Sequence, residues 1–98
     1  MKKKFAFILM GGHYKPEEHT ACFETESGFT YIFTVRSFEE ATEKILSLQR
    51  EGFGAVELCG AFGEAYVQKA IELTHNTLAI GYVVHKPEQD SLFEKFFS

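Results

Sequence analysis

The run from Glu57 to Glu64 holds the residues of this 98-residue chain that are best suited to chemistry. Its pattern predicts that a strand ends at Cys59 and that a turn with glycines at positions 60 and 63 leads into a helix. The first N–H groups of a helix carry partial positive charge, so such a turn can bind an anion. The same placement can lower the pKa of a thiol from about 8.5 into the neutral range. Cys59 is therefore the first candidate for a nucleophile or an acid/base group; the alternative is a small apolar residue that ends a buried strand.

Other polar side chains follow the remaining predicted strands. Ligands of open parallel sheets bind outside the carboxyl ends of the strands, so residues at these ends are the natural partners of Cys59. These residues are Gly11, Gly12, His13, Arg36 and His85. Either histidine could act as a base for the thiol. The arginine could hold a carboxylate of a ligand, or lie at the surface beside Glu39 or Glu40. If the first strand runs antiparallel to the others, His13 moves to the opposite edge.

The turn and the strand before it supply the remaining candidates. Glu57 lies between two apolar residues of a predicted buried strand, where a carboxylate must be paired, protonated or partly exposed. It is accordingly a second catalytic candidate, a partner for Arg36, or a residue on an open side of the sheet edge. The candidate ligand-binding residues are Gly11, Gly12, Arg36, Gly60, Ala61, Phe62 and Gly63. The alternative for the glycine turn is a tight connection that only requires a positive φ.

Motifs for metals and cofactors are missing from the sequence. Suitable ligand atoms are carried by His13, His19, Cys22, Cys59 and His85. None of these residues stands in a Cys-x-x-Cys or His-Glu-x-x-His spacing. The glycine fingerprint of dinucleotide sites and the lysine-bearing phosphate loop are missing as well. We therefore expect neither a metal nor a cofactor.

Composition limits the possible partners and the compartment. The net charge of −4 and the pI near 5.5 argue against a nucleic-acid binder, which usually carries a basic stripe. No apolar run approaches the roughly 18 residues of a membrane span, and the short run after residues 2–4 is too brief for a signal peptide. Two cysteines without a disulfide framework favour the cytoplasm. Phe93, Phe96 and Phe97 cluster near the C-terminus and could cap the core or serve a subunit interface, so we expect a homo-oligomer.

Short apolar runs predict the strands that position these residues. The predicted strands span residues 5–10, 20–25, 29–35, 53–59 and 77–84. The second and third form a hairpin over residues 20–35, with a short helix after Pro16 as the alternative.

Helical spacing alternates with these strands in the second half of the chain. A capping box at Ser37 and Glu40 begins a helix that stops at Gly52. A second helix is predicted from residue 63 or 64 to 74, and a last one begins at Pro87. The sequence thus predicts a single α/β domain over residues 1–98, with a small mainly parallel sheet of four to five strands covered by about three helices.

Four stretches of the sequence resemble a family of small bacterial and archaeal proteins of unknown function. They are Phe7–His13, Pro16–His19, Glu57–Gly63 and Ile80–Val84. The resemblance covers nearly the whole chain and implies a stand-alone single domain of about this length. It implies no activity, cofactor or catalytic residue. More loosely, polar residues at strand ends beside a glycine turn are similar to pieces of (β/α) barrel enzymes, which is an analogy of fold alone.

These observations lead to two expectations about function. The first is a cytoplasmic protein that binds a small anionic metabolite at the carboxyl edge of its sheet, with thiol or acid/base chemistry as a further step. The second is a non-catalytic interaction or scaffold protein that forms a homo-oligomer through its C-terminal aromatic residues. The sequence does not say whether the protein is an enzyme.

Overall fold

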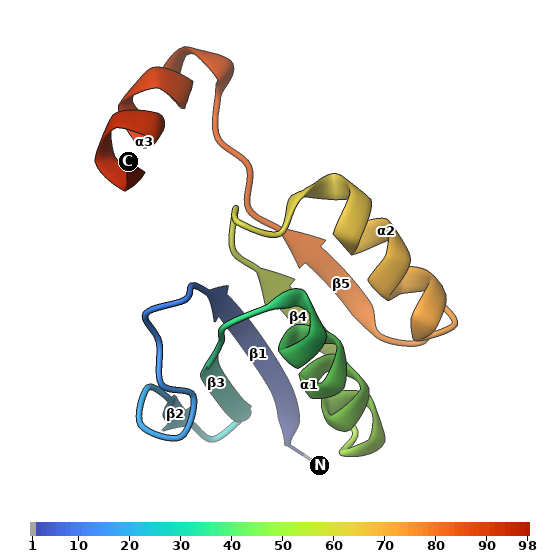
Figure 1. The fold of residues 1–98 in the computed structure, drawn as a ribbon. Coiled ribbons are helices and arrows are strands. Elements are labelled where there is room, and N and C mark those ends of the chain that lie inside the picture. Colours follow the sequence, from blue (N-terminus) through green and yellow to red (C-terminus); the bar gives the residue numbers. More distant parts are fainter. Residues whose placement is uncertain (1) are drawn as a thin grey trace.

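The computed structural model describes residues 2–98 and arranges five strands of this range in one sheet (Figure 1). The strands are β1 (Lys3–Met10), β2 (Ala21–Glu24), β3 (Gly28–Val35), β4 (Ala55–Leu58) and β5 (Ala79–Tyr82). Their order is β2-β3-β1-β4-β5; β2 runs antiparallel to β3, and the other neighbours are parallel. The predicted α/β class, the mainly parallel sheet and the N-terminal hairpin are confirmed.

Two helices pack on the same side of this sheet. The helix α1 (Phe38–Arg50) connects β3 to β4, and α2 (Gly63–Leu73) connects β4 to β5. Both connections step in the same direction across the sheet, so right-handed crossovers place both helices on one face. A hydrogen bond of 2.8 Å between the hydroxyls of Thr42 and Tyr66 joins them side by side. Figure 1 shows this two-layer arrangement.

The C-terminal segment leaves the sheet. After β5 the chain forms a 3₁₀ turn, η1 (Pro87–Gln89), and a third helix, α3 (Asp90–Phe97). In Figure 1, α3 stands beyond the edge of the sheet, away from α1 and α2. The radius of gyration is 14.0 Å, whereas a compact domain of this length has about 13 Å. The last predicted helix therefore forms, but it stands apart from the sheet.

The start of α1 follows the predicted capping box with one difference. The Ser37 hydroxyl accepts a hydrogen bond from the N–H of Glu40 at 3.2 Å, as the box requires. The Glu40 carboxylate, however, accepts the N–H of Arg36, one residue before the cap. Gly52 then follows the helix with a φ of +85°, in agreement with the predicted left-handed stop. The Ser37 cap fixes where β3 gives way to α1, and Gly52 fixes where the helix ends.

The core lies between the sheet and these two helices. Ala6 and Ile8 of β1 and Val56 and Leu58 of β4 are each at most 1% exposed. Alternate residues of a strand share a face, so these four meet the buried helix residues Ala41, Ile45, Leu48, Val67 and Ala70. Burying one large aliphatic side chain contributes about 1.5–3 kcal/mol. This packing fixes α2, and with it the turn that precedes it, relative to the ends of β1 and β4.

The opposite face of the sheet carries no helix in the part of the chain that the structure describes. Phe5, Phe7 and Leu9 of β1 lie on it beside Ile32 of β3, and all four are half-buried. We call this surface the open face. Parallel sheets usually have both faces covered, so the open face is an unusual feature of the fold.

Two strands are shorter than the sequence predicts: β4 covers 55–58 and β5 covers 79–82. Phe53 and Leu78 lie just outside these strands and are 7% and 2% exposed. They are apolar because they pack in the core and not because they pair in the sheet. An apolar run therefore overestimates the length of a strand that enters the core from a buried loop.

Two prolines also differ in detail from the prediction. Pro16 is followed by a turn, in which the N–H groups of Glu18 and His19 donate to the carbonyl of Lys15. Pro87 begins η1, and α3 begins three residues later. Within residues 2–98, no helix combines the length and the apolar character that crossing a membrane requires.

Candidate functional site

The ends of four parallel strands meet at one edge of the sheet. β3, β1, β4 and β5 finish there at Val35, Met10, Leu58 and Tyr82. Because β1 is parallel to its neighbours, His13 leaves the sheet at the same edge as Arg36, Cys59 and His85. The open question about the direction of the first strand is thereby answered. All four candidate residues therefore lie at this edge. The contacts of each residue then decide which chemical role it can have.

Cys59 is half-buried and is held by backbone hydrogen bonds. Its N–H donates to the carbonyl of Ile8 at 3.1 Å, which extends the pairing of β4 with β1 by one residue. Its Sγ accepts the N–H of Met10 at 3.3 Å, and the residue packs against the core. Among residues 2–98, no hydrogen bond joins this thiol to His13 or His85. The thiol thus has a donor that can stabilise negative charge, but no base next to it.

The turn between β4 and α2 is anchored by Phe62. Its N–H donates to the carbonyl of Cys59 at 3.2 Å, and its ring, 4% exposed, packs against Phe38 and Tyr66. Gly63 then adopts a φ of +76°, a conformation that residues with side chains rarely take. None of the described side chains caps the start of α2. The first N–H groups of this helix therefore lack a side-chain acceptor of the protein's own.

A groove that the sequence did not predict opens beside this turn. It lies between α1 and α2 and has a volume of about 660 Å³. Its lining consists mainly of Phe38, Thr42, Phe62, Ala65 and Tyr66, with Glu39 and Lys69 as charged members. The rings of Phe38 and Tyr66 stack at 4.9 Å, and burial raises the pKa of the Tyr66 hydroxyl. The spacing of Phe62 and Tyr66 by one helical turn is the only sequence signal for the groove, since its other wall comes from a separate helix.

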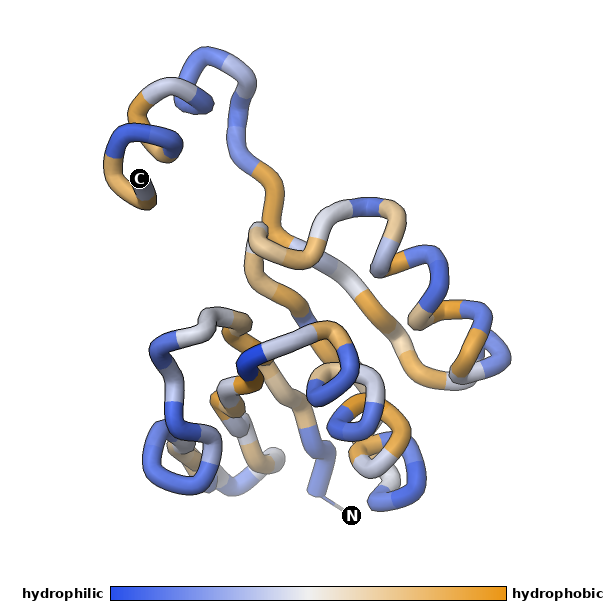
Figure 2. Tube along the Cα trace, in the orientation of Figure 1, coloured by the Kyte–Doolittle hydropathy of each residue, from blue (hydrophilic) through white to orange (hydrophobic). Residues whose placement is uncertain are grey.

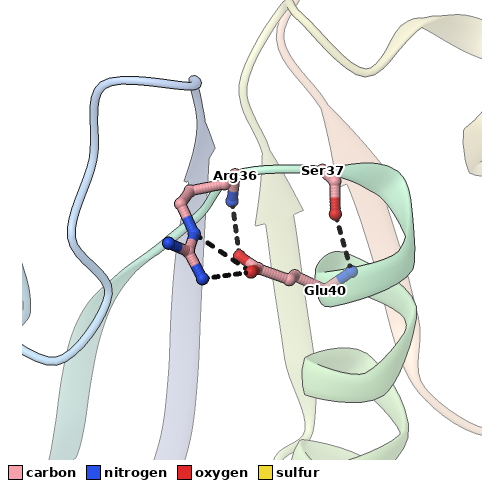
Figure 3. A network of polar contacts seen from close by, with 3 residues as sticks. All are labelled: Arg36, Ser37 and Glu40. Carbon is pink, nitrogen blue, oxygen red and sulfur yellow. Dashed lines mark hydrogen bonds and ion pairs between the residues drawn. The ribbon is translucent and has the colours of Figure 1, made fainter.

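Arg36 is already engaged with a carboxylate of the same chain. Its guanidinium donates two hydrogen bonds to Glu40, from Nε at 3.0 Å and from Nη2 at 2.8 Å, and its N–H donates a third at 2.7 Å (Figure 3). The side-chain hydrogen bond from Arg36 lowers the pKa of the Glu40 carboxyl, and the backbone N–H adds to this effect. The three remaining N–H donors of this guanidinium are open to a ligand, but Glu40 already balances its charge. The second of the two predicted roles, a surface pair beside the helix start, describes the observed contact.

The two candidate histidines are engaged with different neighbours. The exposed ring of His13 lies against Tyr14, with ring centroids 4.2 Å apart. His85 points toward the C-terminal helix, where its Nε2 lies 2.8 Å from Oδ1 of Asp90 and its ring stacks on Phe93 at 4.1 Å. Both residues leave the sheet at the predicted edge. The structure nevertheless shows each in contact with its own segment and not with the thiol.

Glu57 is exposed and lies on the face opposite the core. Val56 and Leu58 on either side of it are buried, so the carboxylate points to the open face. It has no ion-pair or hydrogen-bond partner among the described residues. β4 is an inner strand, so neither burial nor an edge position explains Glu57. Glu57 is exposed because no helix of residues 2–98 covers this face of the sheet.

The possible metal ligands stay apart. No three histidine, cysteine or acidic side chains of residues 2–98 gather closely enough to hold an ion. Both thiols are free, Cys22 at an exposed position of β2 and Cys59 at the carboxyl edge.

The comparison with protein families is decided by one match. The family model described as a family of unknown function, DUF6506, matches residues 3–98. The chain belongs to this family. No curated protein and no solved structure matches this DUF6506 chain. The family description names no activity, so the case for a function depends on the geometry of the edge, the turn and the groove.

Proposed function

We propose that this DUF6506 protein binds a small anionic metabolite where α2 begins, at the carboxyl edge of the sheet. The observation that carries the proposal is the uncapped start of α2 beside a groove of about 660 Å³. The first N–H groups of α2 would bind the anionic group. The aromatic walls formed by Phe38, Phe62 and Tyr66 would hold an apolar or planar part of the ligand, whereas Lys69 and Glu39 give the groove one charge of each sign.

The predicted site residues would contribute to this binding site to different extents. Residues 60–63 supply the turn, and Gly11, Gly12 and His13 follow β1 at the same edge. Arg36 and His85 would add little net charge, because each already pairs with a carboxylate, Glu40 and Asp90 respectively. The bound group therefore relies on backbone N–H donors more than on side-chain charge.

Titration followed by amide NMR tests the proposal with two probes, inorganic phosphate and phenyl phosphate. Both should shift the amide signals of residues 60–65, and phenyl phosphate should bind more tightly because its ring enters the groove. The substitution Phe38→Ala removes an exposed wall of the groove and should weaken the binding of phenyl phosphate alone. Phe23→Ala is the matched control, because Phe23 is exposed on β2 at the far edge of the sheet. Unchanged signals at residues 60–65 with both probes at millimolar concentration would contradict the proposal.

A chemical role for Cys59 belongs to the same proposal, as nucleophile or acid/base group, with Glu57 second. The N–H of Met10 at 3.3 Å from Sγ supports it, and the free thiols fit a reducing compartment such as the cytoplasm. The two cysteines allow a direct comparison. In Cys22→Ala, iodoacetamide at neutral pH should modify Cys59 faster than it modifies Cys22 in Cys59→Ala, although Cys22 is the more exposed. A slower reaction at Cys59 removes the thiol chemistry but leaves ligand binding in place.

A second candidate function is assembly into a homo-oligomer, without catalysis. The observation that favours it is the exposure of the four large apolar residues of α3, namely Leu92, Phe93, Phe96 and Phe97. Deleting residues 93–98 and measuring the mass in solution tests this candidate. A full chain that is already monomeric would contradict it.

A further inference from the structure

The helix α3 carries an apolar stripe that the other described residues, 2–89, leave largely exposed. Leu92, Phe93, Phe96 and Phe97 are 61%, 42%, 79% and 75% exposed. Their spacing places them along one side of the helix. Figure 2 shows these apolar positions on a helix that stands away from the rest of the molecule. We call this set the α3 stripe.

An eight-residue helix is not stable by itself. Isolated helices shorter than about 12–15 residues are marginal in water, so a helix of this length depends on packing. Within residues 2–98, α3 packs substantially only against η1, the turn that precedes it. The partner that stabilises α3 must therefore come from elsewhere.

The segment before α3 leads away from the sheet. The N–H of Val83 donates to the carbonyl of Leu58 at 2.9 Å, so the chain leaves the sheet in the direction of β5. His85 then binds Asp90 at the start of α3 and stacks on Phe93, so that residues 85–93 form one local unit. Packing of this unit on its own sheet would require the chain to reverse within residues 83 and 84, directly after the last hydrogen bond of β5. The direction of the chain favours a partner in another molecule.

The open face offers an apolar surface to such a helix. Phe5, Phe7 and Leu9 form an apolar row along β1. On β4 and β5 the residues that face the same way are the small Ala55, Ala79 and Gly81, together with Glu57, whose carboxylate lies beside Gly81. The α3 stripe can pack against the apolar row, with Glu57 next to it.

We propose that α3 of one copy packs on the open face of a second copy, and that the second copy's α3 packs on the first in return. The inference rests on the second candidate function, assembly into a homo-oligomer, and names its contact surface. Such an exchange is isologous, with the same two surfaces buried on both partners. It would cover the α3 stripe and the bare side of the sheet at the same time.

The area available agrees with a stable dimer. The three phenylalanines of α3 expose the equivalent of about two full aromatic side chains, on the order of 300–500 Å². Leu92, Val83 and Val84 are exposed as well and extend the patch. With the receiving surface included and the contact made twice, the buried total reaches the range of about 1,200–2,000 Å² that specific complexes bury.

One pair of opposite charges could also join the two surfaces. Glu57 lies at the centre of the open face, in register with Phe7, and has no partner among residues 2–98. On α3, Lys95 flanks the stripe and likewise forms no ion pair within this range. A pair between Glu57 and the Lys95 of the second copy would give each charge a partner and would fix the orientation of the helix.

The first measurement is the mass in solution by light scattering. The full chain should be a dimer, and Phe96→Asp combined with Phe97→Asp should reduce its mass two-fold without changing the circular dichroism of the sheet and of α1 and α2. Ser91→Asp lies on the opposite side of α3 and is the matched control that should leave the dimer intact. A monomeric full chain overturns both this proposal and the assembly function. An unchanged mass in the double variant overturns this proposal and leaves assembly through another surface standing.

The second measurement locates the contact. A photo-crosslinking side chain at position 97, in a mixture of isotopically light and heavy protein, should give mixed-mass cross-links to peptides of β1 or β4. Cross-links within single chains overturn the exchange, since they place α3 on its own sheet. Mixed cross-links to the groove at Phe38 and Tyr66, or to α3 of the other copy, overturn the open face as the contact surface and leave the assembly function standing.

Discussion

Gly28→Ala is the sharpest test of the register that brings β1 and β3 to the same edge. Gly28 is buried and directly opposite Lys3 in the parallel pairing of these strands. An added Cβ would lie well inside 3.0 Å of the Lys3 carbonyl oxygen, a separation that real Cβ atoms do not show, and 3.1 Å from the carbonyl carbon. The backbone cannot easily move away, because Gly28 accepts the N–H of Thr25 and Lys3 donates to Ser27.

The size of the effect follows from two opposing contributions. Forcing an extra carbon into a filled site costs about 1–3 kcal/mol. Alanine also restricts the unfolded chain more than glycine does, which stabilises the folded state by about 0.4–1 kcal/mol. We therefore expect a net loss of unfolding free energy on the order of 1–2 kcal/mol. The melting temperature of a domain of this size should fall by about 4–8 °C for each kcal/mol.

Denaturant unfolding followed by circular dichroism, at one protein concentration, measures this loss. Gly54→Ala is the matched control, because Gly54 stands immediately before β4 and an added Cβ would meet no atom of the described residues beyond its chain neighbours within 4 Å. The control should be neutral or slightly stabilising. If Gly28→Ala unfolds at the same denaturant concentration as the control, the reasoning about the β1 and β3 register is wrong.

Three further predictions concern the edge and the core. Because Arg36 lowers the pKa of the Glu40 carboxyl, this pair stabilises the fold above the ordinary carboxyl value of 4.5, and the stabilisation disappears as pH falls through the lowered pKa. The denaturation midpoints of the wild type and Glu40→Gln should therefore differ at neutral pH and converge in acid, and equal midpoints at neutral pH would exclude the effect. Tyr66→Phe should lose about 0.5–1.5 kcal/mol by removing the hydrogen bond to Thr42, and a double-mutant cycle with Thr42→Val should show coupling; additive losses would mean that the bond contributes nothing. Ile8→Ala, at a fully buried position, should cost about 2–5 kcal/mol in urea unfolding, and a loss below 1 kcal/mol would mean that β1 does not pack as described.

The local signals in the sequence predicted the elements well. The Ser37 cap, the stop at Gly52 and the glycines after β1 act within one turn of chain, so their meaning does not depend on the tertiary structure. The same holds for the positive φ of Gly63 at the start of α2. The edge itself was predictable for the same reason, since alternating strands and helices imply parallel neighbours.

The contacts of the candidate side chains were not predictable from their positions at strand ends. Arg36 binds a carboxylate four residues ahead, and His85 binds one five residues ahead. A polar residue that leaves a sheet finds the nearest partner along its own chain before it finds one on a neighbouring strand. Position at the carboxyl edge therefore identifies where a site can be, but not which side chains remain free to serve it.

Glu57 shows what the pattern of one strand cannot reveal. The alternation of Val56, Glu57 and Leu58 indicates that one side of β4 is buried and the other is polar. It does not indicate what covers the polar side. That depends on strand order: because β3, β4 and β5 follow one another in one direction across the sheet, both crossover helices fall on the same face. Residues 2–98 then contain one more helix, α3, and one bare face of the sheet. The last helix of a doubly wound fold would cover that face from within the chain, whereas here α3 stands away from the sheet. The sheet face and the helix are thus both left uncovered within residues 2–98, and this is the observation behind the proposed exchange between two copies.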